Sequence, residues 1–237
     1  MKHSVRFGKR PVPLPMVPAL LGILIWVFPA TAPAGDASAR EILQCLQAGL
    51  EEFHGLTLEY EREILTSSSA ALLGGAGGGD HASGRMDFQP PRFLKITQET
   101  PRSEVVVTDG HTLWWYIPEK REARRYSAEA MGKEMQVLAD VLQGLRDAEE
   151  DFEVIRDGHT ETGDMKVRLI PNPPWSQTDH ISLEITEGCR LRVVEFHNTA
   201  GNVTRFMLGP PRKRESFEEG YFSFIVPEGV RVVDEAP

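Results

Sequence analysis

The sequence lacks the short motifs that mark the common catalytic and metal-binding sites. It contains no G-x-S-x-G, no H-E-x-x-H, no Walker sequence and no paired-cysteine metal motif. Only 8% of its 237 residues are aromatic, so a hydrophobic core must rest mainly on Leu, Val and Ile. We therefore expect no catalytic residues, no cofactor and no bound metal.

Positive charge is scarce beyond the first 34 residues. The whole chain carries a net charge of −9, and residues 35–237 hold 22 basic and 35 acidic side chains, a net charge of −13. A surface this acidic repels the phosphates of nucleic acids, so we expect no nucleic-acid partner.

No apolar run reaches the ~20 residues that span a bilayer. The longest, residues 17–28, follows a basic amino-terminal region and precedes an A-x-A-like site at residues 32–34. This pattern predicts a secretory signal peptide over residues 1–34, cut after Ala34 or alternatively after Ala39, and then a single domain over residues 35–237. The expected location is the periplasm.

The chain has only two cysteines, Cys45 and Cys189. An exported chain meets oxidising conditions, which allow a disulfide between them. Two buried thiols are an equal alternative, because free cysteine packs like a small apolar residue.

Two stretches have helical periodicity. Between residues 37 and 53, apolar residues recur at steps of three and four, which is typical of an amphipathic helix. A second apolar stripe begins at Met131 and Met135 and predicts a helix that ends near residues 144–147, with Ser127 as its candidate cap.

Most of the remaining chain has strand character. Residues 84–116 read as four strands, separated by turns at the prolines near residues 90 and 101 and at Asp109-Gly110. Six later runs favour strands, including one at residues 222–224, and the stiff segment 171–175 connects two of them.

Two polar stretches resemble functional sites but are better explained as a loop and a turn. The glycine-rich residues 72–84 resemble a phosphate loop, but no Gly-Lys-Ser/Thr follows, so a flexible connection is favoured. Asp157, His159, Glu161 and Asp164 form the nearest approach to a metal site, yet they straddle a predicted hairpin turn, where polar residues are expected.

The order and spacing of residues in two regions resemble those of the LolA family of periplasmic lipoprotein carriers. In the first region the matching residues are Gly84, Pro90, Phe93, Pro101, Val107, Asp109, Gly110, Leu113, Trp114, Tyr116 and Pro118. In the second they are Phe222, Phe224, Pro227, Gly229, Val230 and Val232.

The resemblance implies a mainly β fold with α-helices: an unclosed antiparallel β-barrel of about 11 strands, covered by a lid of two or three helices over an apolar cavity. It also implies a function. Such a carrier shields lipoprotein acyl chains, receives them from an inner-membrane ABC transporter and passes them to an outer-membrane receptor. We expect a monomer that performs no chemistry.

Strand alternation offers candidates for the cavity lining, although a shift of one residue would exchange the two faces. The predicted lining residues are Met86, Phe88, Phe93, Val105, Val107, Trp114, Met135 and Leu138. Gln89 stands where the family usually has an arginine linked to lid closure, and it is the candidate gating residue. Glutamine has neither the charge nor the forked donors of arginine.

A second function stays open. A LolA-like fold also suits a periplasmic lipid-binding or sensor module that holds a membrane protein's periplasmic segment. The basic runs at residues 120–125 and 212–214 are candidate docking patches in either case, although solvated turns are the favoured explanation.

Overall fold

The computed structural model describes residues 34–50, 53–66, 80–127, 133–142, 144–145 and 148–235. The predicted signal peptide up to residue 33, most of the glycine-rich stretch and Met131 lie outside these residues. No helix in the described part of the chain has the length and apolarity needed to cross a membrane.

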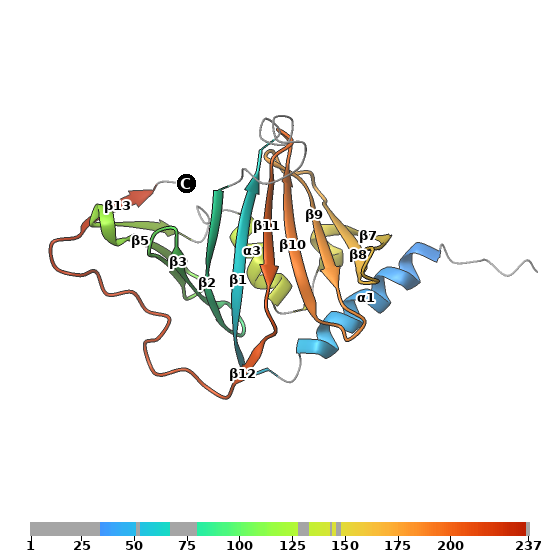
Figure 1. Ribbon diagram of the computed structural model, residues 1–237, viewed down its shortest axis with the longest axis horizontal. Coiled ribbons are helices and arrows are strands. Elements are labelled where there is room, and N and C mark those ends of the chain that lie inside the picture. The colour runs from blue at the N-terminus through green and yellow to red at the C-terminus, as the bar shows by residue number, and fades with distance from the viewer. Residues whose placement is uncertain are drawn as a thin grey trace, which may run out of the picture. The chain divides into compact units, whose positions relative to one another are not determined.

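A single open sheet forms most of the described fold (Figure 1). Its strands follow the order β13-β6-β5-β4-β3-β2-β1-β11-β10-β9-β8-β7, and β12 pairs with one end of β1. All pairs are antiparallel except β13 with β6. The strands are β1 (Gly55–Leu65), β2 (Asp80–Gln89), β3 (Phe93–Thr100), β4 (Glu104–Thr108), β5 (Thr112–Ile117), β6 (Glu122–Ser127), β7 (Phe152–His159), β8 (Met165–Pro171), β9 (Thr178–Ile185), β10 (Leu191–Asn198), β11 (Val203–Leu208), β12 (Arg212–Arg214) and β13 (Arg231–Glu235).

Three α-helices and one 3₁₀ turn accompany the sheet in the described residues. They are α1 (Ala34–Leu50), η1 (Pro118–Lys120), α3 (Lys133–Leu142) and α4 (Ala148–Asp151). In the view of Figure 1, α3 lies behind the strands at the middle of the sheet. The mainly β fold class with an unclosed sheet is confirmed, and the described strands number thirteen rather than about eleven.

Residues paired across neighbouring strands share one face of the sheet. From β2 to β5 one face carries the register Met86, Ile96, Val106 and Trp115. The opposite face carries Asp87, Lys95, Val107 and Trp114. We call these the inner and outer faces, because the helices pack on the first.

The hydrophobic core lies between the inner face and the helices. Leu46 of α1 and Leu138 and Val141 of α3 are fully buried in one cluster with Met86 and Leu183 of the sheet. Burying a side chain of this size contributes roughly 1.5–3 kcal/mol, so this seam dominates the stability of the fold.

A C-terminal strap, residues 215–230, covers the outer face of β2 to β5. It is the orange to red coil between β12 and β13 in Figure 1. The Phe222 ring lies 5.5 Å from Phe93, and the Phe224 ring lies 5.3 Å from Trp114, both measured between centroids. The strap therefore gives the aromatic outer face an apolar cover.

A buried carboxylate fastens the strap to the sheet. Asp87 is 1% exposed and accepts hydrogen bonds from Tyr221 of the strap at 2.7 Å, from Thr57 at 2.6 Å and from Arg85 at 3.0 Å. Burial raises the pKa of the Tyr221 hydroxyl, and its hydrogen bond to Asp87 raises it further. Three donors satisfy a carboxylate that would otherwise be costly to bury.

Two glycines of the four-strand segment meet a steric requirement. A Cβ at Gly84 would clash with the carbonyl oxygen of Thr97 on the neighbouring strand. Gly110 has φ of +89°, a left-handed conformation that glycine adopts without penalty, in the turn between β4 and β5. The predicted four strands and their turns are confirmed.

Three details differ from the sequence-based expectation. Ser127 ends β6 rather than capping a helix, and residues 222–224 lie in the strap rather than in a strand. Both basic runs contain strand residues, those of β6 and β12. Their arginines form ion pairs with neighbouring strands, such as Arg125 with Asp234 at 2.6 Å. These cross-strand pairs offset the low tendency of a charged run to form a strand.

A disulfide joins Cys45 of α1 to Cys189, with their Cα atoms 5.1 Å apart. Cys189 lies in the turn between β9 and β10. The bond therefore ties the first helix to the second half of the sheet, across 144 residues of sequence.

Reduction of this disulfide should lower stability by about 4 kcal/mol, because a crosslink over so long a loop restricts the unfolded chain. Denaturant unfolding with and without dithiothreitol measures the effect. The Cys45→Ser/Cys189→Ser double variant should match the reduced wild type and should not respond to dithiothreitol. An unchanged unfolding midpoint would contradict this role.

Tyr221→Phe should destabilise the protein by about 1 kcal/mol, because it removes one of the three donors to Asp87. The strap should also become easier to cleave with protease. Tyr116→Phe is the matched control, since the Tyr116 ring also touches Phe224, at 5.4 Å. Equal effects of the two substitutions would count against the Asp87 contact as the fastening point.

Candidate functional site

An apolar cavity lies between the inner face of the sheet and α3. Its volume is about 480 Å³, a size typical of small-molecule sites. Its walls come from both halves of the sheet and from the helix. The lining residues are Arg62, Ile64, Val106, Leu113, Trp115, Tyr126, Met135, Leu138, Phe196, Thr204 and Phe206.

Aromatic rings form much of the wall on the sheet side. Phe206 stands between Tyr60 and Phe196, with ring centroids 6.1 and 6.2 Å away. Trp115 turns its indole N–H to the Glu104 carboxylate at 2.9 Å, which satisfies its only polar atom. Rigid apolar surface of this kind suits an apolar ligand.

The eight predicted lining residues divide into three groups. Met135 and Leu138 of α3 line the cavity. Met86 and Phe88 lie on the inner face but are fully buried in the core beside it. The structure places the other four on the outer face, away from the cavity: Phe93, Val105, Val107 and Trp114.

The misplaced group has a physical explanation. Val107 pairs with Trp114, so the predicted β4 and β5 residues are consistent with each other and are displaced together by one position. Helices cover one face of these strands and the strap covers the other, so both faces are apolar. Alternation therefore carries no contrast between inside and outside here.

Most of the lining escaped prediction from the sequence. Val106, Leu113 and Trp115 are the inner-face neighbours of the residues that were chosen. Phe196 and Phe206 belong to β10 and β11, which were predicted as strands without assigning a face. A contrast was available in β1, where Leu58 and Tyr60 alternate with Glu59 and Glu61. The register pairs Tyr60 with Leu208 of β11, which shares the inner face with Phe206.

Comparison with known proteins identifies the family. The family model described as "Outer membrane lipoprotein carrier protein LolA" matches residues 76–225, more than half of the chain. The chain belongs to the LolA family. The match spans β2 to β11 and most of the strap, and so includes the sheet strands that line the cavity except β1.

Curated relatives extend this match beyond the family model. An outer-membrane lipoprotein carrier protein of Halorhodospira halophila is 30% identical over 210 residues, which cover 87% of this chain and 89% of the relative. One from Nitrosospira multiformis is 29% identical over 157 residues, covering 65% and 73%.

A solved structure supports the fold. An uncharacterized conserved protein from Thermus thermophilus superposes with a TM-score of 0.52 and 14% identity, covering 84% of this chain and 99% of that protein. At this identity the likeness extends to the fold alone.

At Gln89 this LolA-family chain departs from the family pattern, which usually has an arginine at that position. Gln89 ends β2 and pairs with Phe93, so it continues the outer-face register of Asp87. Within the described residues its side chain makes no hydrogen bond to α3. The gating role of Gln89 stays a prediction, and the register gives it no support.

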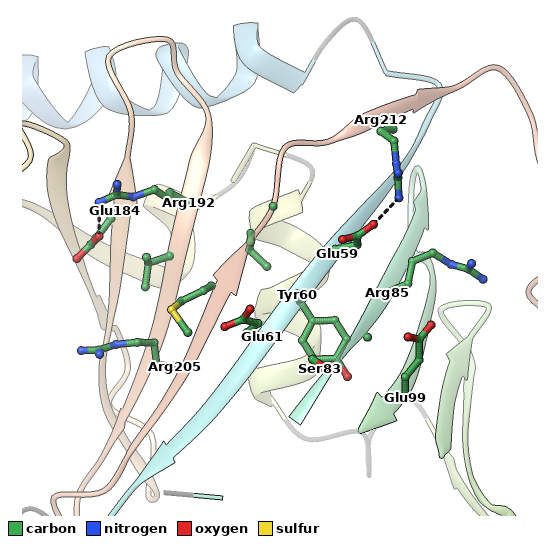
Figure 2. Close-up of a pocket in the computed structure, with 15 residues that line it drawn as sticks. Glu59, Tyr60, Glu61, Ser83, Arg85, Glu99, Glu184, Arg192, Arg205 and Arg212 are labelled. Carbon is green, nitrogen blue, oxygen red and sulfur yellow. Dashed lines mark hydrogen bonds and ion pairs between the residues drawn. The ribbon is translucent and has the colours of Figure 1, made fainter. Parts of the chain in front are cut away.

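A larger hollow of about 980 Å³ lies on the outer face of this LolA-family sheet (Figure 2). Four arginines and four glutamates line it, and ion pairs link Arg212 with Glu59 at 3.0 Å and Arg192 with Glu184 at 3.2 Å. Charged walls cannot replace water around an acyl chain, so the smaller apolar cavity is the better candidate for a lipid site.

The candidate metal cluster is not assembled. Asp157 forms an ion pair with Arg168 at 2.5 Å, and Asp164 forms one with Arg192 at 2.5 Å. Both carboxylates are therefore paired with arginines. His159 lies beside Arg156. Among the residues that the structure describes, no group of three or more acidic, histidine or cysteine side chains could hold a metal ion.

Glu195 belongs to the ion pairs of the outer face. The His197 ring lies 3.0 Å from one carboxylate oxygen, and Arg205 donates to the other at 2.6 Å. The hydrogen bond from His197 is the largest cause that lowers the pKa of Glu195 to about 2; burial opposes this shift, and Arg205 reinforces it.

Because the pKa of Glu195 is lower in the folded state, its contribution to stability should be complete above about pH 4.5 and should vanish as the pH falls toward 2. Glu195→Gln should therefore lower the free energy of unfolding at pH 7 but change it little near pH 2. Denaturant titrations across this range measure the difference. The control is Glu187→Gln, at an exposed turn position. A difference from wild type that stays constant with pH would refute the assignment.

Proposed function

We propose that the cavity between the inner face and α3 shelters acyl chains of lipoproteins, and that the chain carries them toward the outer membrane. The observation that carries the proposal is an apolar cavity of about 480 Å³ within a LolA-family fold. The relatives are named outer-membrane lipoprotein carrier proteins. Those names favour a carrier over the sensor alternative.

The physical need for a carrier follows from hydration. Each CH₂ group exposed to water costs about 0.8 kcal/mol, so a lipoprotein with several acyl chains cannot cross an aqueous space unaided. Phe196, Phe206 and Trp115 supply the apolar cover on one side of the cavity, and Met135 and Leu138 supply it on the other. Methionine adapts to irregular ligands because its side chain is flexible and polarizable.

The proposed route begins with export and removal of residues 1–34. Cleavage after Ala34 would leave α1 whole except for its first residue, whereas cleavage after Ala39 would fall within it. The mature chain, a monomer in the periplasm, would receive cargo from an inner-membrane lipoprotein-releasing ABC transporter and deliver it to an outer-membrane receptor. The proposal includes no chemical step, cofactor or metal.

Two substitutions one residue apart test the cavity. Phe206→Glu should weaken binding of a fluorescent acyl probe by about tenfold or more, since burying the charge costs well over 1.4 kcal/mol. Met207→Glu is the matched control, because Met207 lies on the opposite face of the same strand, at the outer hollow. Met135→Glu tests the helix side of the cavity.

Equal probe binding by the two β11 variants, both shown to be folded by circular dichroism, would place the ligand elsewhere. Native mass spectrometry of protein purified from periplasm without detergent identifies the cargo. Acylated peptide or lipoprotein in the extract is the expected finding. An empty protein attached to a membrane-protein fragment would favour the sensor instead.

A further inference from the structure

One charged side chain enters the apolar cavity from β1. Arg62 lines the cavity together with Phe206, its cross-strand partner, and Ile64. Its side chain is 27% exposed, whereas the arginines of the outer hollow named above are 41% and 64% exposed. A guanidinium this sheltered needs acceptors to offset its lost hydration.

Those acceptors are incomplete. Arg62 Nε is buried and has no hydrogen-bond partner among the described residues. In the same part of the chain, the only carboxylate within 4.0 Å of the guanidinium is that of Asp80, at 4.0 Å, and Asp80 is 62% exposed. That distance is too long for a hydrogen bond, so the described residues do not supply the guanidinium with a full set of acceptors.

Two other groups of this face, Glu104 and Tyr60, could counter the charge of Arg62 if they were anionic and unpaired. Glu104 accepts from Trp115 and lies 3.6 Å from Arg102. Burial raises the pKa of Tyr60 to about 12, so its hydroxyl stays neutral beside Arg62, whose positive charge opposes that rise. Neither group neutralises the guanidinium.

We propose that Arg62 makes the cavity selective for acyl lipids that carry an anionic oxygen, of a phosphate or a carboxylate, at the root of the chain. When acyl chains displace water from the cavity, the guanidinium loses its remaining solvent. A neutral carbonyl would leave its charge uncompensated, whereas an anionic oxygen would accept charge-assisted hydrogen bonds from the Nη groups. The chains would then extend along Phe206 and Met135.

This inference rests on the proposed function only in requiring that the cavity takes acyl chains. It adds a ligand class, the acidic lipid, that a lipoprotein carrier does not itself require.

Three single-chain probes of equal length test it: dodecyl phosphate, dodecanoate and dodecanol. The anions are used below their micelle concentrations and dodecanol below its solubility limit, each to displace a fluorescent acyl probe. Wild type should bind one or both anions about tenfold more tightly than dodecanol, as expected for a charge-assisted hydrogen bond in a sheltered site. The anion bound more tightly distinguishes a phospholipid headgroup from a free fatty acid.

Arg62→Met should abolish the preference for anions while dodecanol binds as before or more tightly. Arg62→Gln is the second variant, in case methionine disturbs the fold, and it should also lose the preference. Arg205→Met is the matched control, because Arg205 lies on the outer face of β11 and pairs with Glu195 and Glu63. It should keep the wild-type preference.

The outcomes separate the two proposals. Wild type that binds dodecanol and both anions equally would overturn the role of Arg62 while leaving acyl carriage intact. An anion preference that survives in Arg62→Met and Arg62→Gln would overturn it too. Wild type that binds none of the three probes would instead refute the cavity as an acyl site.

Discussion

Strands β4 and β5 carry apolar side chains on both faces, and both faces must be covered. A sheet in this condition would otherwise expose aromatic surface such as Trp114 on one side and Trp115 on the other. The helices cover the inner face, and the strap covers the outer one through Phe222 and Phe224. The two covers differ in kind: the helix layer leaves a cavity, whereas the strap is fastened through the buried carboxylate of Asp87.

This arrangement explains why the C-terminal segment is part of the functional design although it does not touch the cavity. Without the strap, Phe93, Val107 and Trp114 would belong to an exposed apolar patch on the outer face, and such patches promote association with other chains. The disulfide adds a second tie, between α1 and the far half of the sheet, so both ends of the described chain are held to it.

The covering of both faces also limits which features of the fold can be predicted from the sequence. Proline, Asp-Gly and alternating strand residues predicted the turns and strands of residues 84–116, because each acts locally. The faces of β4 and β5 could not be predicted, since Val106 and Val107 are both partly or fully buried and differ only in what covers them. That information depends on the strap, more than 100 residues away. Strand β6 was missed for a related reason: its arginines pair with Glu235 and Asp234 of β13, a contact that no local pattern encodes.

Under the proposed function, the size of the cavity determines how cargo is held and released. A volume of about 480 Å³ suits a ligand of drug size, and several acyl chains exceed it, so α3 must shift when they enter. The described part of α3 buries Val137, Leu138 and Val141, so the helix depends on packing for its stability. It would exchange contacts of Val137, Leu138 and Val141 with the sheet for contacts with the cargo. The lost contacts offset part of the free energy gained by burying the acyl chains, which keeps the affinity low enough for a carrier to pass its cargo on.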